Sequence, residues 1–216
     1  MFGFFKKKSK VSARNLNHFS ELKSKDLVTF KDRSILPLEL QGQSFTVERV
    51  QSYQYDDGVS PEFVLQHPAG NVFTVMCSDL EEGETLTIAK KLPHEIVDAL
   101  FSMPELESIF SDDVSTALAV QQENIPKDFE GWLPERYMRT IYNAVGFFYK
   151  DDRRSQGVSD YVGDGSEELR YHECTGTPDH FSLNIEIWED GSTDIFVQIT
   201  VPQNVISEMW PNEQQD

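Results

Sequence analysis

Three side chains that could bind a metal ion lie close together in this sequence, at His172, Cys174 and His180. Structural zinc sites usually combine two pairs of ligands, each pair separated by about two to four residues. The spacing here, H-x-C-x5-H, does not fit that pattern, so we predict that this segment holds no metal. The other cysteine, Cys77, shares a predicted strand face with apolar residues and is expected to be a small buried hydrophobe.

Pairs of adjacent acidic residues recur along the chain, and paired carboxylates can serve as acid and base or bind calcium. Most of these pairs stand beside Gly or Ser in segments typical of turns, so we interpret them as solvated surface groups. The segment Asp164-Gly165-Ser166 also lacks the ligand spacing of an EF-hand loop. The pairs are Asp56-Asp57, Glu81-Glu82, Asp112-Asp113, Asp151-Asp152 and Glu167-Glu168.

Familiar enzyme signatures are missing from the sequence. It contains no G-x-S-x-G, P-loop, G-x-G-x-x-G or H-E-x-x-H motif, so nucleophilic, phosphoryl-transfer, dinucleotide and zincin chemistries lack their usual residues. We therefore predict no catalytic residues and no cofactor. One alternative stays open, in which an enzyme or small-molecule-binding protein uses one or two carboxylates in a pocket between two sheets.

Aromatic and basic residues meet at one place in the second half of the chain. Phe147-Phe148-Tyr149 is followed closely by Arg153-Arg154, and arginine and aromatic side chains are common anchors of protein interfaces. The pattern also fits a strand that leaves the core and enters a charged loop. The candidate interaction face consists of Phe147, Phe148, Tyr149, Arg153 and Arg154.

The first ten residues form a second candidate contact region. Aromatic residues are followed at once by lysines, and each basic residue near an anionic membrane contributes on the order of 1 kcal/mol. The alternative is an ordinary flexible, solubilising start of the chain. The candidate membrane-contact residues are Phe2, Phe4, Phe5, Lys6, Lys7, Lys8 and Lys10.

Charge is distributed unevenly along the chain. Residues 1–33 carry nine Lys and Arg against three Asp and Glu, whereas residues 34–216 carry ten against thirty-four. The formal net charge of −18 argues against nucleic-acid binding, because phosphate contacts need clustered basic residues. The acidic body would also be repelled by an anionic membrane. A basic protein partner is the better electrostatic match.

The cellular location is predicted from what the sequence lacks. Two cysteines in 216 residues do not make a disulfide framework. No apolar run approaches the roughly 20 residues that a membrane-spanning helix needs, and the charges that follow the first apolar residues reverse the order of a signal peptide. We expect a cytoplasmic protein, peripheral to the inner membrane if the first ten residues bind it.

The clearest predicted element is a hairpin over residues 181–201, where apolar and polar residues alternate on both arms. Loop parity decides which side chains share a face, and an odd loop pairs Ile187 with Ile195 and Ile185 with Val197. Residues around 142–149 and 169–174 are predicted to be strands that bury the apolar face. The polar face, which is expected to meet water or a partner, consists of Asn184, Glu186, Gln198 and Thr200.

The remaining patterns complete an α+β fold, mostly antiparallel β, with two small sheets joined by a helical connector. Residues 1–34 are predicted to be a basic, flexible leader, and residues 35–92 a small β-rich module. Residues 93–134 form a helical and acidic connector with a helix over 93–102. Residues 135–216 form the second antiparallel module, with a closing helical turn over 205–210.

Two stretches carry a family resemblance. QGQSFTVERVQSYQYDDGVSPEFVLQHPAGNVFTV and ELRYHECTGTPDHFSLNIEIWEDGSTDIFVQITV are similar to segments of uncharacterised bacterial proteins of the YjfK-like type. The resemblance implies a cytoplasmic, non-enzymatic accessory or protein-binding module, linked to envelope stress and to a membrane-stress partner. It brings no catalytic residues, and the lysine-rich start departs from the family, so membrane contact is not implied by it.

Overall fold

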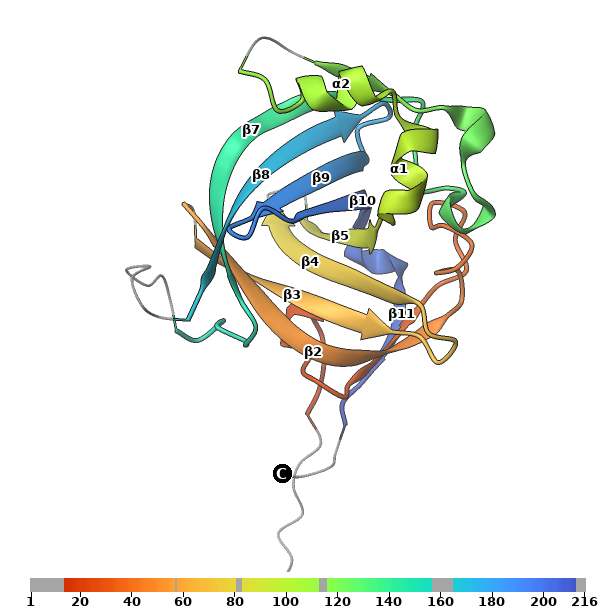
Figure 1. Ribbon diagram of the computed structural model, residues 1–216. Helices are drawn as coiled ribbons and strands as arrows, with labels where there is room; N and C mark the ends of the chain where they lie inside the picture. Colours follow the sequence, from red (N-terminus) through yellow and green to blue (C-terminus); the bar gives the residue numbers. More distant parts are fainter. Residues whose placement is uncertain (1–13, 57, 81–82, 113–115, 157–164, 213–216) are drawn as a thin grey trace, which may run out of the picture.

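The computed structural model describes residues 14–56, 58–80, 83–112, 116–156 and 165–212. Antiparallel strands dominate these ranges, with two short α-helices (Figure 1), as the composition and alternation predicted. The strands are β1 (Leu27–Phe30), β2 (Ser44–Tyr55), β3 (Gly58–Gln66), β4 (Val72–Leu80), β5 (Gly83–Lys91), β6 (Ala117–Ala119), β7 (Arg136–Tyr149), β8 (Glu167–Gly176), β9 (Phe181–Trp188), β10 (Thr193–Pro202) and β11 (Ile206–Trp210). The helices are α1 (His94–Leu100) and α2 (Met103–Ser108), and 3-10 turns cover Phe19–Glu21, Gln122–Asn124, Lys127–Phe129 and Gln203–Val205.

All the described strands belong to one sheet, in the order β11-β1-β2-β3-β4-β5-β10-β9-β8-β7-β6. Because β2 also pairs with β7, eight of these strands form a closed ring in the order β2, β3, β4, β5, β10, β9, β8, β7. A sheet can close on itself only when its strands twist and tilt. Irregularities in β2 near Glu48 and in β7 near Asn143 add to the bend.

The predicted division into two small sheets is wrong. Strand β5, from the first half of the chain, pairs with β10, from the last quarter, over seven consecutive residue pairs. This ladder joins the two halves of the chain into one sheet, and the β2–β7 ladder joins them a second time. Pairing between residues more than ninety positions apart leaves no local mark in the sequence.

The β9–β10 hairpin has the odd loop that alternation predicted, but its register differs. A three-residue loop ends at Gly191, whose φ of 84° suits this kind of hairpin connection. Ile185 therefore pairs with Ile195 and not with Val197. Because the difference is an even number of residues, every side chain still points to the predicted face.

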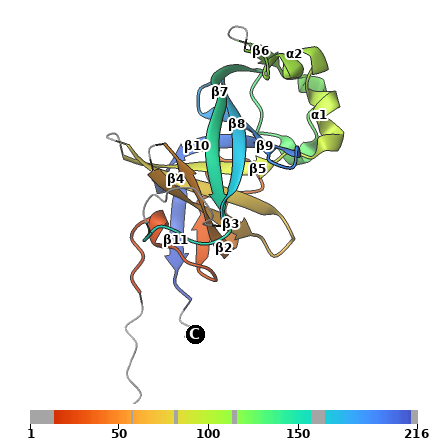
Figure 2. The ribbon, with the colours of Figure 1, turned by 60° about the vertical axis from the view of Figure 1, so that its left-hand side comes forward.

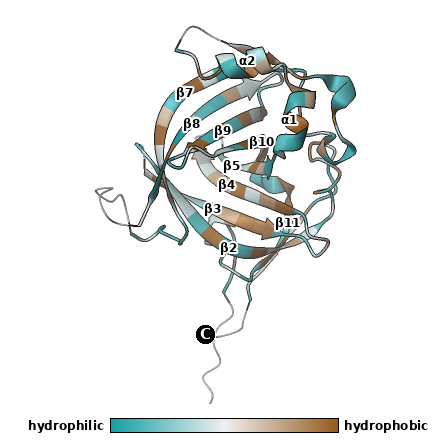
Figure 3. Ribbon diagram, viewed as in Figure 1, coloured by the Kyte–Doolittle hydropathy of each residue, from teal (hydrophilic) through white to brown (hydrophobic). Residues whose placement is uncertain are grey.

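Residues on one face of the ring strands contribute to one hydrophobic core, which lies against the rest of the chain. The alternation of apolar and polar residues along the strands is visible in Figure 3. Trp132, from the connector, stacks on Phe73 with ring centroids 5.6 Å apart. Core residues from the ring include Phe45, Val47, Phe63, Leu65, Phe73, Val75, Leu86, Ile88, Leu183, Ile185, Val197 and Ile199.

The connector forms part of this core and does not act as a spacer between two modules. The helix predicted over residues 93–102 is observed as α1, followed directly by α2, and Figure 2 shows both together at one side of the strands. Val97 and Leu100 of α1 are buried, as is Leu106 of α2. The two helices and the 3-10 turns after them therefore cover apolar strand residues.

Residues 14–34 also belong to the folded body, which corrects the flexible leader predicted for residues 1–34. Phe19, Leu22, Val28 and Phe30 are at most 1% exposed. The ring of Phe19 meets that of Phe63 edge-on, at 5.1 Å between centroids. Phe19 belongs to the 3-10 turn Phe19–Glu21, and Val28 and Phe30 belong to β1.

The end of the described chain needs a similar correction. The helical turn predicted over residues 205–210 is a strand, β11, which pairs with β1 and places Leu27 opposite Trp210. Only Gln203–Val205 is helical, as a 3-10 turn. Strand pairing satisfies the backbone groups of both segments, so the partner strand, not local propensity, decides the structure here.

Candidate functional site

The polar face of the ring strands encloses a cavity of about 900 Å³, with a second of about 220 Å³ beside it. Residues from all eight ring strands line the larger cavity. Successive strand residues point to opposite faces, so the positions that alternate with the core face the cavity. The residues that line both cavities are Glu62, Thr74, Ala89, Glu186 and Phe196.

Two carboxyl groups are buried where the cavities meet. Glu62 of β3 is 7% exposed and Glu186 of β9 is 3% exposed. Glu62 accepts a short hydrogen bond from the side-chain amide of Gln51. Glu186 accepts hydrogen bonds from Asn184 Nδ2 at 3.0 Å and from the Tyr53 hydroxyl at 3.4 Å. Strands on different sides of the ring thus place their carboxylates toward one another.

Burial opposes the ionisation of both groups. It raises the pKa of Glu62, although hydrogen bonds from Thr74 and Gln51 and the charge of Arg49 act in the other direction. Burial, together with the charge of Glu62, raises the pKa of Glu186 to about 8. A carboxyl pair in a low-dielectric site retains a proton more readily than the same groups in water.

Neither buried carboxylate has an ion pair with another described residue. The cavity lining contains two described cations, Arg49 and Lys91, and both are engaged elsewhere. Arg49 donates to Gln51 Oε1 at 3.0 Å and pairs with a carboxylate outside the lining at 3.1 Å. Lys91 pairs with Asp194 at 2.6 Å. Within the described part of the chain, the charge of Arg49 therefore acts on Glu62, but neither buried carboxylate has a cation as its ion-pair partner.

An aromatic wall, defined as Tyr53, Tyr55, Phe148, Tyr171 and Trp188, runs along one side of the cavities. Neighbouring rings contact each other, with centroids between 5.1 and 5.9 Å apart, in the order Tyr171, Tyr55, Tyr53, Phe148, Trp188. The wall draws on β2, β7, β8 and β9. Burial and the neighbouring carboxylates raise the pKa of Tyr53 and of Tyr55, so both hydroxyls stay protonated and available as hydrogen-bond donors.

One acceptor at the smaller cavity is left without a partner among the described residues. The amide nitrogen of Asn184 donates to Glu186, but its buried Oδ1 receives no hydrogen bond. Buried polar atoms are rarely left unsatisfied. A bound molecule or water that donates a hydrogen bond at this point would satisfy it.

The predicted interaction face is divided by the structure. Phe148 belongs to the aromatic wall, whereas Tyr149 is fully buried on the other face and donates to Gln54 Oε1 at 3.1 Å. Phe147 is half-buried. The guanidinium of Arg153 lies 3.9 Å from the centroid of the Tyr149 ring. A role of these residues in partner binding stays a prediction.

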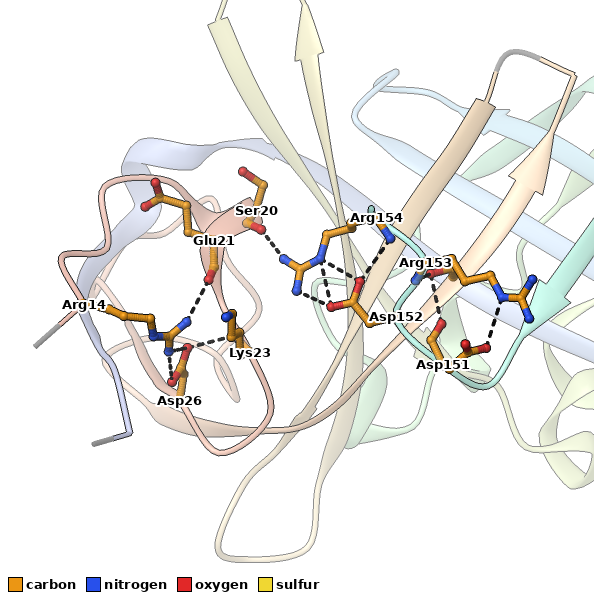
Figure 4. A network of polar contacts seen from close by, with 10 residues as sticks. Arg14, Ser20, Glu21, Lys23, Asp26, Asp151, Asp152, Arg153 and Arg154 are labelled. Atoms are coloured by element: carbon orange, nitrogen blue, oxygen red, sulfur yellow. Dashed lines mark hydrogen bonds and ion pairs between the residues drawn. The ribbon is translucent and has the colours of Figure 1, made fainter. Parts of the chain in front are cut away.

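Arg154 belongs to a polar network that ties the segment after β7 to the start of the described chain (Figure 4). It pairs with Asp152, with Nε 2.8 Å from Oδ1, and donates to the backbone oxygen of Ser20. A second ion pair in the same region joins Arg14 to the buried Asp26. Both predicted arginines thus have partners within the chain.

The candidate metal ligands do not converge. His172 is buried beside the rings of Phe110 and Tyr142, and burial lowers its pKa. Burial raises the pKa of the Cys174 thiol to about 12. Within the described ranges, no group of three or more His, Cys, Asp or Glu side chains is placed to hold a metal ion.

Two groups of predicted residues remain, the candidate membrane-contact residues and the acidic pairs. The candidate membrane-contact residues, Phe2 to Lys10, lie outside the described residues. Of the acidic pairs, Glu167-Glu168 is exposed and lines the larger cavity. No helix in the described ranges combines the length and the apolar character needed to cross a membrane.

Sequence reasoning missed Glu62 and Glu186, and it placed Glu186 in contact with water or a partner. A weak signal was present, because each is a single acid on a strand that also contributes residues to the hydrophobic core. The polar face was taken as the solvent face, and closure of the sheet turned that face inward.

Comparisons with protein-family models, with curated proteins and with solved structures found no match to this chain. The resemblance to YjfK-like proteins therefore stays a prediction from the sequence.

Proposed function

We propose that this protein binds a small organic molecule inside the closed sheet. The cavity of about 900 Å³, with two buried carboxyl groups and an aromatic wall, carries the proposal. Ligand sites typically measure about 300 to 1,000 Å³ and combine apolar walls with a few placed polar groups. The volume and the mixed lining both fit that description.

This function accounts for more of the described residues than a protein-binding accessory module does. The residues expected to touch a membrane lie outside the described ranges, and those expected to touch a partner contact the chain itself. By contrast, the cavity gives a role to Glu62 and Glu186. Burial of these carboxyl groups is unfavourable for folding, and such costs are expected at functional sites.

Filling the cavity tests the proposal. Ala89 is 4% exposed and lines both cavities, so A89F places a ring in the space that a ligand would occupy. Nile red, a neutral dye whose emission shifts to shorter wavelength in apolar surroundings, is the probe. We expect the wild-type protein to bind the dye at least about tenfold more tightly than A89F does, because overfilling a site removes its contacts.

Two controls keep the result interpretable. A69F adds the same ring in an exposed turn and should leave dye binding unchanged. A89V adds less volume, so it should weaken dye binding by an intermediate amount. This variant keeps the test usable if A89F folds poorly. Equal dye binding by wild type, A89V and A89F, or no dye binding by any of them, would contradict a ligand site in the cavity.

A further inference from the structure

We infer that the ligand of this cavity carries an organic cation, an amine joined to an apolar body, whose charge lies between Glu62 and Glu186. The inference rests on the proposed function and names the chemical class of the ligand. The apolar body would pack against the aromatic wall, and the ammonium group would take the place of the ion-pair partner that both carboxylates lack.

The first reason is charge. A carboxylate buried without a cation is costly, and protein interiors normally pair it or keep it protonated. In the described chain the pair has hydrogen-bond donors but no ion-pair partner, and Arg49, whose charge acts on Glu62, is itself held by Gln51 and Glu48. The raised pKa of both groups is the response expected of such a pair without ligand. A bound ammonium group would supply the missing charge and release a proton.

The second reason is the wider lining of the larger cavity. Its described residues include seven carboxylates and two cations. Arg49 and Lys91 are already held by other groups, at 3.0 Å from Gln51 and 2.6 Å from Asp194. An anionic ligand would meet repulsion here, and a neutral ligand would leave the buried carboxylates uncompensated.

The third reason is the aromatic wall. Tyrosine and tryptophan rings present a negative face that attracts ammonium groups within about 6 Å of the ring centroid. Tyr53 contacts both components of the site, because its ring packs against Phe148 and its hydroxyl donates to Glu186. Aromatic rings beside carboxylates are the usual chemistry of sites for organic cations.

Ionisable groups from several strands surround the pair and decide how binding depends on pH. Because cation binding and protonation compete for the same carboxylates, affinity should rise as the pH rises through the pKa of Glu186. The groups that face the pair are Tyr53, Tyr55 and Arg49 from β2, Tyr171 and Glu173 from β8, Lys91 from β5 and Asp194 from β10.

Three probes of one shape test the charge preference. 2-Phenylethylamine, 2-phenylethanol and 3-phenylpropionate share a phenylethyl body and differ in charge, so calorimetric titration of the full chain with each isolates the effect of the charge. We expect the amine to bind at least about tenfold more tightly than the alcohol, and the carboxylate to bind most weakly, because buried charge pairs of opposite sign favour association.

E186Q keeps the size of the side chain and removes the negative charge. This substitution should weaken binding of the amine by about tenfold and leave the affinity for the alcohol within about twofold of wild type. E123Q, an exposed position outside both cavity linings, should change neither probe. Nile red binding by E186Q reports whether the variant still forms the cavity.

The outcomes separate the two proposals. If Nile red binds in the cavity but the alcohol matches or exceeds the amine, the cation inference is wrong and the proposed function stands. If E186Q leaves the amine preference intact, the carboxylate pair does not supply it, and the inference is again wrong. If the wild-type protein does not bind the dye, or A89F and A89V bind it equally well, the proposed function itself fails.

Discussion

Glu186 is held where ionisation is unfavourable, and this has a consequence for stability. Its pKa is raised from 4.5 to about 8 by burial and by the charge of Glu62. The folded protein therefore keeps a proton that the unfolded chain loses near pH 4.5. The contribution of Glu186 to the free energy of unfolding is fully present below about pH 4.5 and is lost as the pH rises through about 8.

We therefore expect the free energy of unfolding to fall by about 2 to 3 kcal/mol between about pH 6 and about pH 9, through Glu186 alone. Urea titrations at several pH values measure it. E186Q, which resembles the protonated group, should flatten this dependence, whereas E123Q should keep it. A wild-type protein with constant stability over that range would show that Glu186 ionises normally.

Loss of the Asp26 carboxylate should lower the free energy of unfolding strongly. Asp26 is fully buried, and its carboxylate accepts from Arg14 at 2.5 Å and from the backbone N–H groups of Lys23 and Asn212 at 2.8 Å. Segments from the beginning and the end of the described chain thus share one carboxylate. Removing one partner of a buried ion pair leaves the other groups uncompensated.

D26A should accordingly lower the free energy of unfolding by about 3 kcal/mol. The matched variant D32A removes an exposed carboxylate and should stay within about 0.5 kcal/mol of wild type. Chemical denaturation of both variants decides the matter. Similar stabilities for D26A and D32A would mean that the network around Asp26 contributes little.

The contact between β2 and β7 is the element on which closure of the sheet depends, and it is short. It consists of three residue pairs, centred on Tyr53 and Phe148. Beside it, the buried hydroxyl of Ser52 accepts from the backbone N–H of Arg153 at 2.8 Å and donates to the backbone oxygen of Asp151 at 3.1 Å. The hydroxyl thus fixes the chain directly after β7.

S52A leaves two backbone groups without this partner, so we expect a loss of about 1 to 3 kcal/mol in the free energy of unfolding. Amide hydrogen exchange should also speed up at the end of β7 before it does in β9 or β10, because local opening begins where few bonds hold a strand. S34A, at an exposed position, is the control. Unchanged exchange in β7 would show that other contacts close the sheet.

Local patterns predicted the individual strands well and their assembly poorly. Alternation over residues 181–201 assigned every side chain to the correct face, since this depends only on parity. The exact partners depend on where the turn is centred, and a turn centred on Asp190, where Gly191 was expected, moved them by two residues. The β5–β10 ladder depends on the whole chain, so no window of sequence contains it.

The candidate site was hidden for the same reason. Alternation indicates that Glu186 and Asn184 oppose the hydrophobic core, and in an open sheet that face meets water. Closure converts the same face into the lining of a cavity. The residue types were visible in the sequence, but their burial follows from a strand pairing that the sequence does not signal.

At the scale of the whole molecule, the net charge of −18 means that the cavity belongs to a protein with a strong excess of negative charge. Four exposed carboxylates of the lining stand on the two neighbouring segments that begin β8 and follow β9: Glu167, Glu168, Glu189 and Asp190. Charges of one sign around a cleft raise the local concentration of oppositely charged ligands and their association rates.

Association of 2-phenylethylamine should therefore slow as salt is added. Between about 0.01 M and about 1 M salt the screening length falls from about 30 Å to about 3 Å, and we expect the association rate constant to fall about fivefold or more. Stopped-flow emission of Trp188, which lines the cavity, follows the reaction, and W188F identifies its signal. The neutral 2-phenylethanol should show little change, because screening acts only on charged ligands.

Charge reversal then locates the source of the field. E189K places a positive charge in the cavity lining, whereas E130K makes the same change at an exposed position outside it. The effect of an exposed charge decays over the screening length. E189K should therefore slow association of the amine more than E130K does at low salt, and the rate constants of the two variants should converge at high salt. Equal effects at low salt would assign the steering to the net charge of the whole protein and not to the acids around the cavity.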